Sequence, residues 1–67
     1  MSADEHLRRA EELLQRLEGA RDQLERLAED EDPDADRAVE VLQELAELAK
    51  QVEQELARAR REAESEG

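Results

Sequence analysis

His6 is the residue best suited to chemistry near neutral pH, where an imidazole can act as general acid, general base or metal ligand. Each of these roles needs further groups beside the ring, and the chain contains no second histidine and no cysteine. Carboxylates are abundant, with 21 aspartates and glutamates, but the helical pattern described below places them on solvated faces rather than in a cleft. We therefore predict no catalytic residue, no metal site, no cofactor and no small-molecule ligand, with His6 partly exposed near a helix end.

Aspartates at positions 30, 32, 34 and 36 alternate in the manner of a calcium-binding loop. Counted from Asp30, the position that requires glycine is Ala35, and the position that requires a bidentate glutamate is Val41. Neither requirement is met. We expect a solvated acidic turn instead of an ion site.

Three arginines near the C-terminus, Arg58, Arg60 and Arg61, could in principle bind phosphate. The chain as a whole carries a formal charge of −11 and no aromatic residue, so it repels nucleic acid and anionic lipid and cannot stack on bases. We interpret the arginines as cations that complement the dipole at a helix end. Apolar runs of two or three residues are too short to span a bilayer, and no signal-like segment follows Met1, so we expect a cytoplasmic protein with no direct nucleic-acid or membrane partner.

Apolar residues in the second half of the chain recur at alternating spacings of four and three, which keeps them on one helical face. This predicted seam consists of Ala38, Leu42, Leu45, Ala49, Val52, Leu56, Ala59 and Ala63. We predict a helix over residues 33–64, with Asp32 as its N-cap and Pro33 as its first residue.

The first half of the chain has the same periodicity, and Ser2 with Glu5 forms a capping-box pattern at its start. We predict a helix over residues 3–29. Its seam consists of Ala3, Leu7, Ala10, Leu14, Leu17, Leu24 and Ala28, flanked by Leu13, Ala20 and Leu27. Arg21 interrupts the seam, so we expect its methylenes to cover apolar neighbours while its guanidinium reaches water or a carboxylate of the facing helix. Alternatively, Arg21 selects register or partner.

A turn over residues 30–32 is too short for anything but an αα-hairpin, so residues 1–67 form one all-α unit with two antiparallel, coiled-coil-like helices. Two helices enclose no core, and the second helix carries apolar residues on both flanks of its seam. We therefore expect completion by a protein partner or by oligomerisation. The predicted partner-binding residues are Val39, Val41, Leu42, Leu45, Leu48, Val52 and Leu56.

The run from Ala38 to Ala59 resembles the second helix of the exodeoxyribonuclease VII small subunit. The order of parts is also similar: a helix ending near Leu27, a short acidic turn containing Pro33, and a longer second helix. The resemblance implies a non-catalytic hairpin that binds the large nuclease subunit in several copies, while the large subunit degrades single-stranded DNA. The alternative is a self-associating hairpin, natural or designed, that forms an antiparallel four-helix bundle with no bound substrate.

Overall fold

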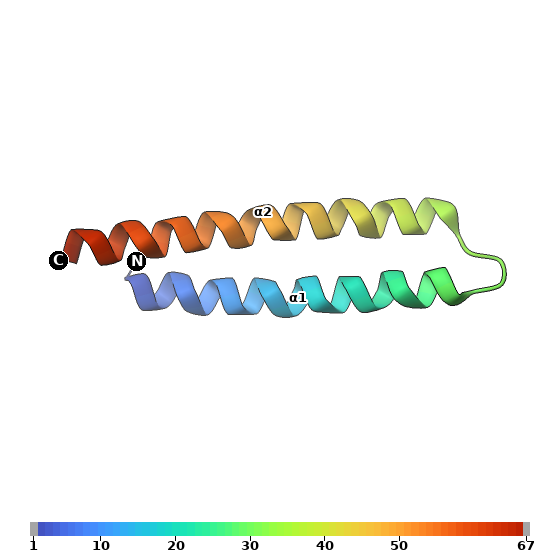
Figure 1. The fold of residues 1–67 in the computed structure, drawn as a ribbon, viewed down its shortest axis with the longest axis horizontal. Helices are drawn as coiled ribbons and strands as arrows, with labels where there is room; N and C mark the ends of the chain where they lie inside the picture. The colour runs from blue at the N-terminus through green and yellow to red at the C-terminus, as the bar shows by residue number, and fades with distance from the viewer. Residues whose placement is uncertain (1, 67) are drawn as a thin grey trace.

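The computed structural model describes residues 2–66, which form two antiparallel helices joined by a short turn (Figure 1). Helix α1 spans Ala3–Glu29 and helix α2 spans Ala35–Glu66. The predicted all-α hairpin is confirmed, and α1 has the predicted bounds. The hairpin measures 54 × 14 × 12 Å, and its two broad faces each expose one side of both helices. Within residues 2–66, neither helix contains an apolar stretch long enough to cross a membrane.

Ser2 caps the start of α1. The backbone N–H of Glu5 donates to Ser2 Oγ at 3.2 Å, and the N–H of His6 donates to the Ser2 carbonyl at 3.1 Å. The Glu5 carboxylate accepts from the Ser2 hydroxyl at 3.4 Å, rather than from the Ser2 amide as a full capping box would require. The serine half of the predicted box is thus present.

The turn is longer than predicted, and α2 begins two residues later. Asp34 is its cap, because the Arg37 N–H donates to Asp34 Oδ1 at 3.1 Å and the Ala38 N–H donates to the Asp34 carbonyl at 3.0 Å. The N–H of Asp32 instead donates to Asp30 Oδ1 at 3.3 Å within the turn. Asp34, and not Asp32, therefore caps the free amides at the start of α2. Pro33 precedes this cap, so it lies outside the helix.

The other end of α2 also lies beyond the predicted boundary, at Glu66. The last turn of α2 therefore contains no basic residue, because it begins after Arg58, Arg60 and Arg61. The prediction that these arginines complement the dipole at the helix end is wrong. Arg58 pairs with Glu55, and Arg60 pairs with Glu64 at 3.2 Å.

The contact between the helices keeps part of the predicted seam and replaces the rest with residues one position earlier in the chain. The residues that lie in the contact as predicted are Ala10, Leu17, Leu24, Leu45, Val52 and Ala59. In α1 the buried residues are His6, Ala10, Leu13 and Ala20, with Leu17, Leu24 and Leu27 partly buried. In α2 they are Val41, Leu48, Val52, Glu55 and Ala59, with Leu45 partly buried. We call these residues the buried seam. Four leucines of the predicted seam are exposed instead, namely Leu7 (44%), Leu14 (41%), Leu42 (52%) and Leu56 (45%).

Both rows have the same 3.5-residue spacing, so periodicity alone does not choose between them. On α1 the exposed row includes the charged Arg21. In this part of the helix the buried row has the apolar residues Ala20 and Leu27. The guanidinium of Arg21 lies 3.9 Å from Glu25 of the same helix, and both side chains are largely exposed. The prediction that Arg21 covers the seam is therefore wrong. Burying the alternative row keeps this cation in water, which avoids its desolvation cost.

Candidate interaction face

The register of the hairpin follows from one contact between its helices. His6 touches Glu55, and these two numbers add to 61. Leu13 with Leu48, and Ala20 with Val41, satisfy the same relation and belong to one buried cluster. Residues of α1 and α2 whose numbers add to 61 therefore lie level along the hairpin.

The exposed leucines gather on one broad face. Leu7 and Leu14 each follow a buried residue of α1 by one position, as Leu42 and Leu56 do on α2. In an antiparallel pair, a two-fold axis perpendicular to the plane of the helices exchanges them and leaves each broad face in place. Because the offset is the same on both helices, these leucines share a face. We call it the apolar face; its members are Leu7, Leu14, Val39, Leu42, Ala46, Ala49 and Leu56.

The opposite broad face, here called the polar face, carries residues that precede the buried positions of each helix. They include Arg9, Arg16, Gln23, Gln51 and Arg58. A shallow groove on this side is lined by Arg9, Gln51, Arg58 and neighbours from both helices. The two broad faces of one small hairpin therefore differ in chemistry.

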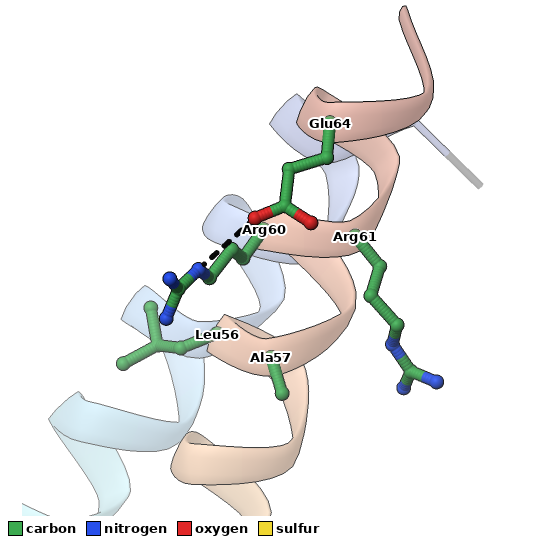
Figure 2. Close-up of a pocket in the computed structure, with 5 residues that line it drawn as sticks. All are labelled: Leu56, Ala57, Arg60, Arg61 and Glu64. Carbon is green, nitrogen blue, oxygen red and sulfur yellow. Dashed lines mark hydrogen bonds and ion pairs between the residues drawn. The ribbon is translucent and has the colours of Figure 1, made fainter.

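Another depression on the surface lies at the C-terminal end of α2. Figure 2 shows Leu56 and Arg60 on one side of the helix, with Arg61 pointing to the other side. Residue 59 lies level with Ser2, so most of this depression extends past the start of α1. It is open, and it continues the apolar face at Leu56.

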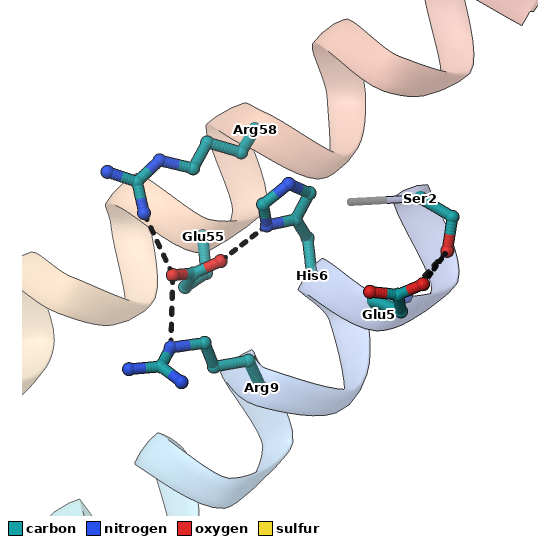
Figure 3. Close-up of polar contacts among 6 residues, drawn as sticks. All are labelled: Ser2, Glu5, His6, Arg9, Glu55 and Arg58. Atoms are coloured by element: carbon teal, nitrogen blue, oxygen red, sulfur yellow. Dashed lines mark hydrogen bonds and ion pairs between the residues drawn. The ribbon is translucent and has the colours of Figure 1, made fainter.

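A buried ion-pair cluster closes the seam near the open end of the hairpin (Figure 3). Glu55 is only 5% exposed, and its Oε2 accepts a hydrogen bond from His6 Nδ1 at 2.6 Å. Its Oε1 lies 2.9 Å from Arg58 Nη1 and 3.3 Å from Arg9 Nε. Both carboxylate oxygens are thus occupied, and within residues 2–65 no buried side-chain N or O atom lacks a partner.

The hydrogen bond from His6 is the main reason that the pKa of Glu55 lies below its usual value, because the bond favours the ionised carboxylate. Burial acts in the opposite direction, and the charges of Arg58 and Arg9 add to the lowering. Arg9 and Arg58 are half-exposed, so solvent screens their contribution. The cluster holds the two helices together.

The prediction that the His6 imidazole is partly exposed is wrong. His6 is 7% exposed, and its ring is hydrogen-bonded to Glu55 of α2. Glu55 was not predicted at all. A signal for this contact is present in the sequence: His6 and Glu55 are polar residues in equivalent heptad rows. They become level once the helices are folded about the turn.

The predicted partner-binding residues divide into two groups. Val41, Leu48 and Val52 are buried in the seam, and Leu45 packs against them, so these four bind the hairpin's own α1. Val39, Leu42 and Leu56 are exposed on the apolar face and remain available to another chain. Leu7 and Leu14, which were predicted to lie in the seam, join them there.

Comparison of the chain with protein-family models, with curated proteins and with solved structures gave no match. Over residues 2–65, no three His, Cys, Asp or Glu side chains are grouped as a metal site would require. The structure thus defines the class of the protein, a small all-α helical hairpin with one apolar broad face.

Proposed function

We propose that this chain is a non-catalytic assembly module, which works by burying its apolar face against helices of another polypeptide. The supporting observation is that five large apolar side chains, Leu7, Leu14, Val39, Leu42 and Leu56, are each 41–52% exposed. Contiguous apolar surface of this kind marks interaction sites, because its burial is favourable and its exposure to water is not.

The polar chemistry of the hairpin supports the same proposal. The buried Glu55 and His6 satisfy each other and tie α1 to α2, so their arrangement is explained by the fold. The apolar face is the feature that the hairpin's own fold leaves unexplained. Short apolar runs and an acidic surface suit a module that works in the cytoplasm, which is the compartment we propose.

The specific assembly that we propose to test is a nuclease complex. The run from Ala38 to Ala59, and the order of a first helix, an acidic turn and a longer second helix, resemble the exodeoxyribonuclease VII small subunit. In such a complex this chain would be an accessory subunit, and the large subunit would degrade single-stranded DNA.

Co-expression with the exodeoxyribonuclease VII large subunit of the same genome tests this proposal. The tagged large subunit should retain the wild-type hairpin, while the variant with Leu42→Glu and Leu56→Glu should stay helical by circular dichroism and be lost. The matched control combines Arg16→Glu with Gln54→Glu, which changes the charge more but leaves the apolar face intact, and it should be retained.

Retention of the Leu42→Glu, Leu56→Glu variant would show that the apolar face is not the binding surface. Failure of the wild type to bind the large subunit, together with association through the apolar face elsewhere, would reject the nuclease complex and leave the assembly role in place.

A further inference from the structure

We infer that the occupant of the apolar face is a second copy of this chain, packed in a four-helix bundle with both turns at the same end. This inference rests on the proposed assembly role and names its partner. The broad face runs along the 54 Å length of the hairpin. Its five large apolar side chains are 41–52% exposed, so a second copy laid along this length would remove apolar surface from water.

Two symmetric arrangements would bury the same face. A two-fold axis parallel to the helices places α1 on α2 of the second copy, and both turns lie at one end. An axis across the helices, in the plane of the face, places α1 on α1 of the second copy, with the turns at opposite ends. Charge and shape along the two edges of the face decide between them.

In the same-end arrangement the second copy is not shifted along the helix axis. A residue of α1 therefore lies opposite the residue of the second copy's α2 for which the two residue numbers add to about 61. Leu7 then lies within one turn of Leu56, and Leu14 lies between Ala46 and Ala49. A large side chain thus meets small ones in the middle of the face, as helices packed closely require.

Charges on the outer edge of the face are also complementary in the same-end arrangement. Arg8 comes level with Glu53 of the second copy, and Glu11 comes level with Lys50. Within residues 2–65, the ion pairs of the hairpin involve none of these four side chains. Each copy carries a net charge of −11, so two copies repel each other. Salt screens this repulsion at distances beyond the Debye length, whereas ion pairs at contact distance are screened less.

The opposite-end arrangement brings like charges together. The α1 edge of the face carries acids at positions 4, 11, 18 and 25, one per heptad. Packing α1 on α1 of the second copy would set this acidic row against itself, which is unfavourable. The geometry therefore selects the arrangement with both turns at one end.

Sedimentation equilibrium of the full chain tests the pairing first. We expect twice the mass of 7.7 kDa for the wild type, and a helical monomer for the variant with Leu14→Glu and Leu42→Glu. A wild-type chain that stays monomeric at millimolar concentration would overturn the second copy as partner. Binding to the nuclease subunit is a separate measurement, so failure here is distinguishable from failure of the proposed function.

Spin labels at Glu31→Cys, an exposed turn position, test the orientation. With turns at the same end, and helices packed 8–10 Å apart, the labels of two copies should lie on the order of 20–30 Å from each other. With turns at opposite ends the distance should approach the 54 Å length of the hairpin. The longer distance would overturn the arrangement.

A charge exchange gives an independent check. Glu11→Lys should weaken the pair about twofold to fivefold in Kd, because it sets a lysine level with Lys50 of the second copy. Adding Lys50→Glu should restore the wild-type value. Strengthening of the pair by Glu11→Lys alone would indicate acidic rows in contact, and would contradict the same-end arrangement.

Discussion

The two halves of the buried seam are held together by different chemistry. From the middle of the hairpin to the turn, Leu48, Ala20 and Val41 exclude water with apolar side chains, and Val41 is 0% exposed. We call this part the turn half. Near the open end, His6 and Glu55 are as deeply buried, with alanines as their seam neighbours. One half thus relies on apolar burial and the other on a directed polar contact.

Because of this difference, the overall stability of the hairpin and the alignment of its two helices depend on different residues. Apolar burial is non-directional, so the turn half would tolerate a small slide of one helix along the other. A buried carboxylate is costly unless its donors stand in the correct places, so Glu55 accepts one alignment of α1. The polar contact lies at the end farthest from the turn, where the connection constrains the helices least. We infer that the turn half stabilises the hairpin and the open half aligns it.

The largest expected effect comes from charging the turn half. The combination of Val41→Glu and Leu48→Glu buries two unpaired carboxylates. Each should lower the free energy of unfolding by several kcal/mol, and together they should exceed the total stability of a small hairpin. We expect loss of helix in circular dichroism at pH 7. The matched control, Val39→Glu with Ala46→Glu, adds the same charge at exposed positions of the same helix and should remain helical. Helical spectra for both variants would contradict the buried role of Val41 and Leu48.

The next effect is a cavity in the same half. Leu48→Ala removes a side chain that is 7% exposed, and such truncations cost about 2 to 5 kcal/mol, less where the site can collapse. Urea unfolding followed by circular dichroism measures the change. If Leu48→Ala costs no more than an exposed surface substitution, the turn half does not provide the main apolar stabilisation.

Some of this architecture could be predicted from sequence, and some could not. The heptad pattern and Ser2 were enough to predict the hairpin and the bounds of α1, since both are local signals. The start of α2 was missed because Asp32 and Asp34 both suit an N-cap, and Pro33 is compatible with either. Only the observed bond from the Arg37 amide to Asp34 decides between them.

The other half of the seam, which contains Val41, Leu48 and Glu55 on α2, was missed for a different reason. Each helix carries two apolar rows with equal spacing, and α2 read alone favours the row with Leu42 and Leu56. The correct row contains Glu55, which looks unsuitable for burial until His6 and Arg9 are brought level with it by the other helix. That choice depends on both helices at once, so a reading of each helix separately cannot make it.

A smaller effect, dependent on pH, tests the open half. Glu55→Gln removes the charge that His6 and the two arginines stabilise, and should lower the free energy of unfolding at pH 7, by less than Leu48→Ala does. The pKa of Glu55 is lowered in the folded state, so the contact stabilises above the unfolded-state value of 4.5 and is lost as pH falls through the folded-state pKa. The stability difference between wild type and variant should therefore shrink in acid below about pH 4.5.

Urea melts of both proteins at several pH values measure that difference, and comparison with the variant removes the general effect of protonating the other carboxylates. A control with Glu53→Gln changes an exposed glutamate of the same helix and should show no comparable dependence. A constant difference between wild type and Glu55→Gln across this range would show that the ionised carboxylate does not hold the open end.

The smallest expected effect separates the backbone of α1 from the seam. Gly19 lies in the interior of α1 on its solvent side, and a Cβ added there would meet no atom within 4 Å. Gly19→Ala should stabilise the hairpin by about 0.5 to 1 kcal/mol, because glycine loses more backbone entropy in a helix than alanine does. Since the substitution touches neither half of the seam, hydrogen exchange should slow at both ends of α1 by a similar factor. Slowing confined to the turn end would show that the open end unfolds independently, and that His6 and Glu55 couple the helices less tightly than the apolar half does.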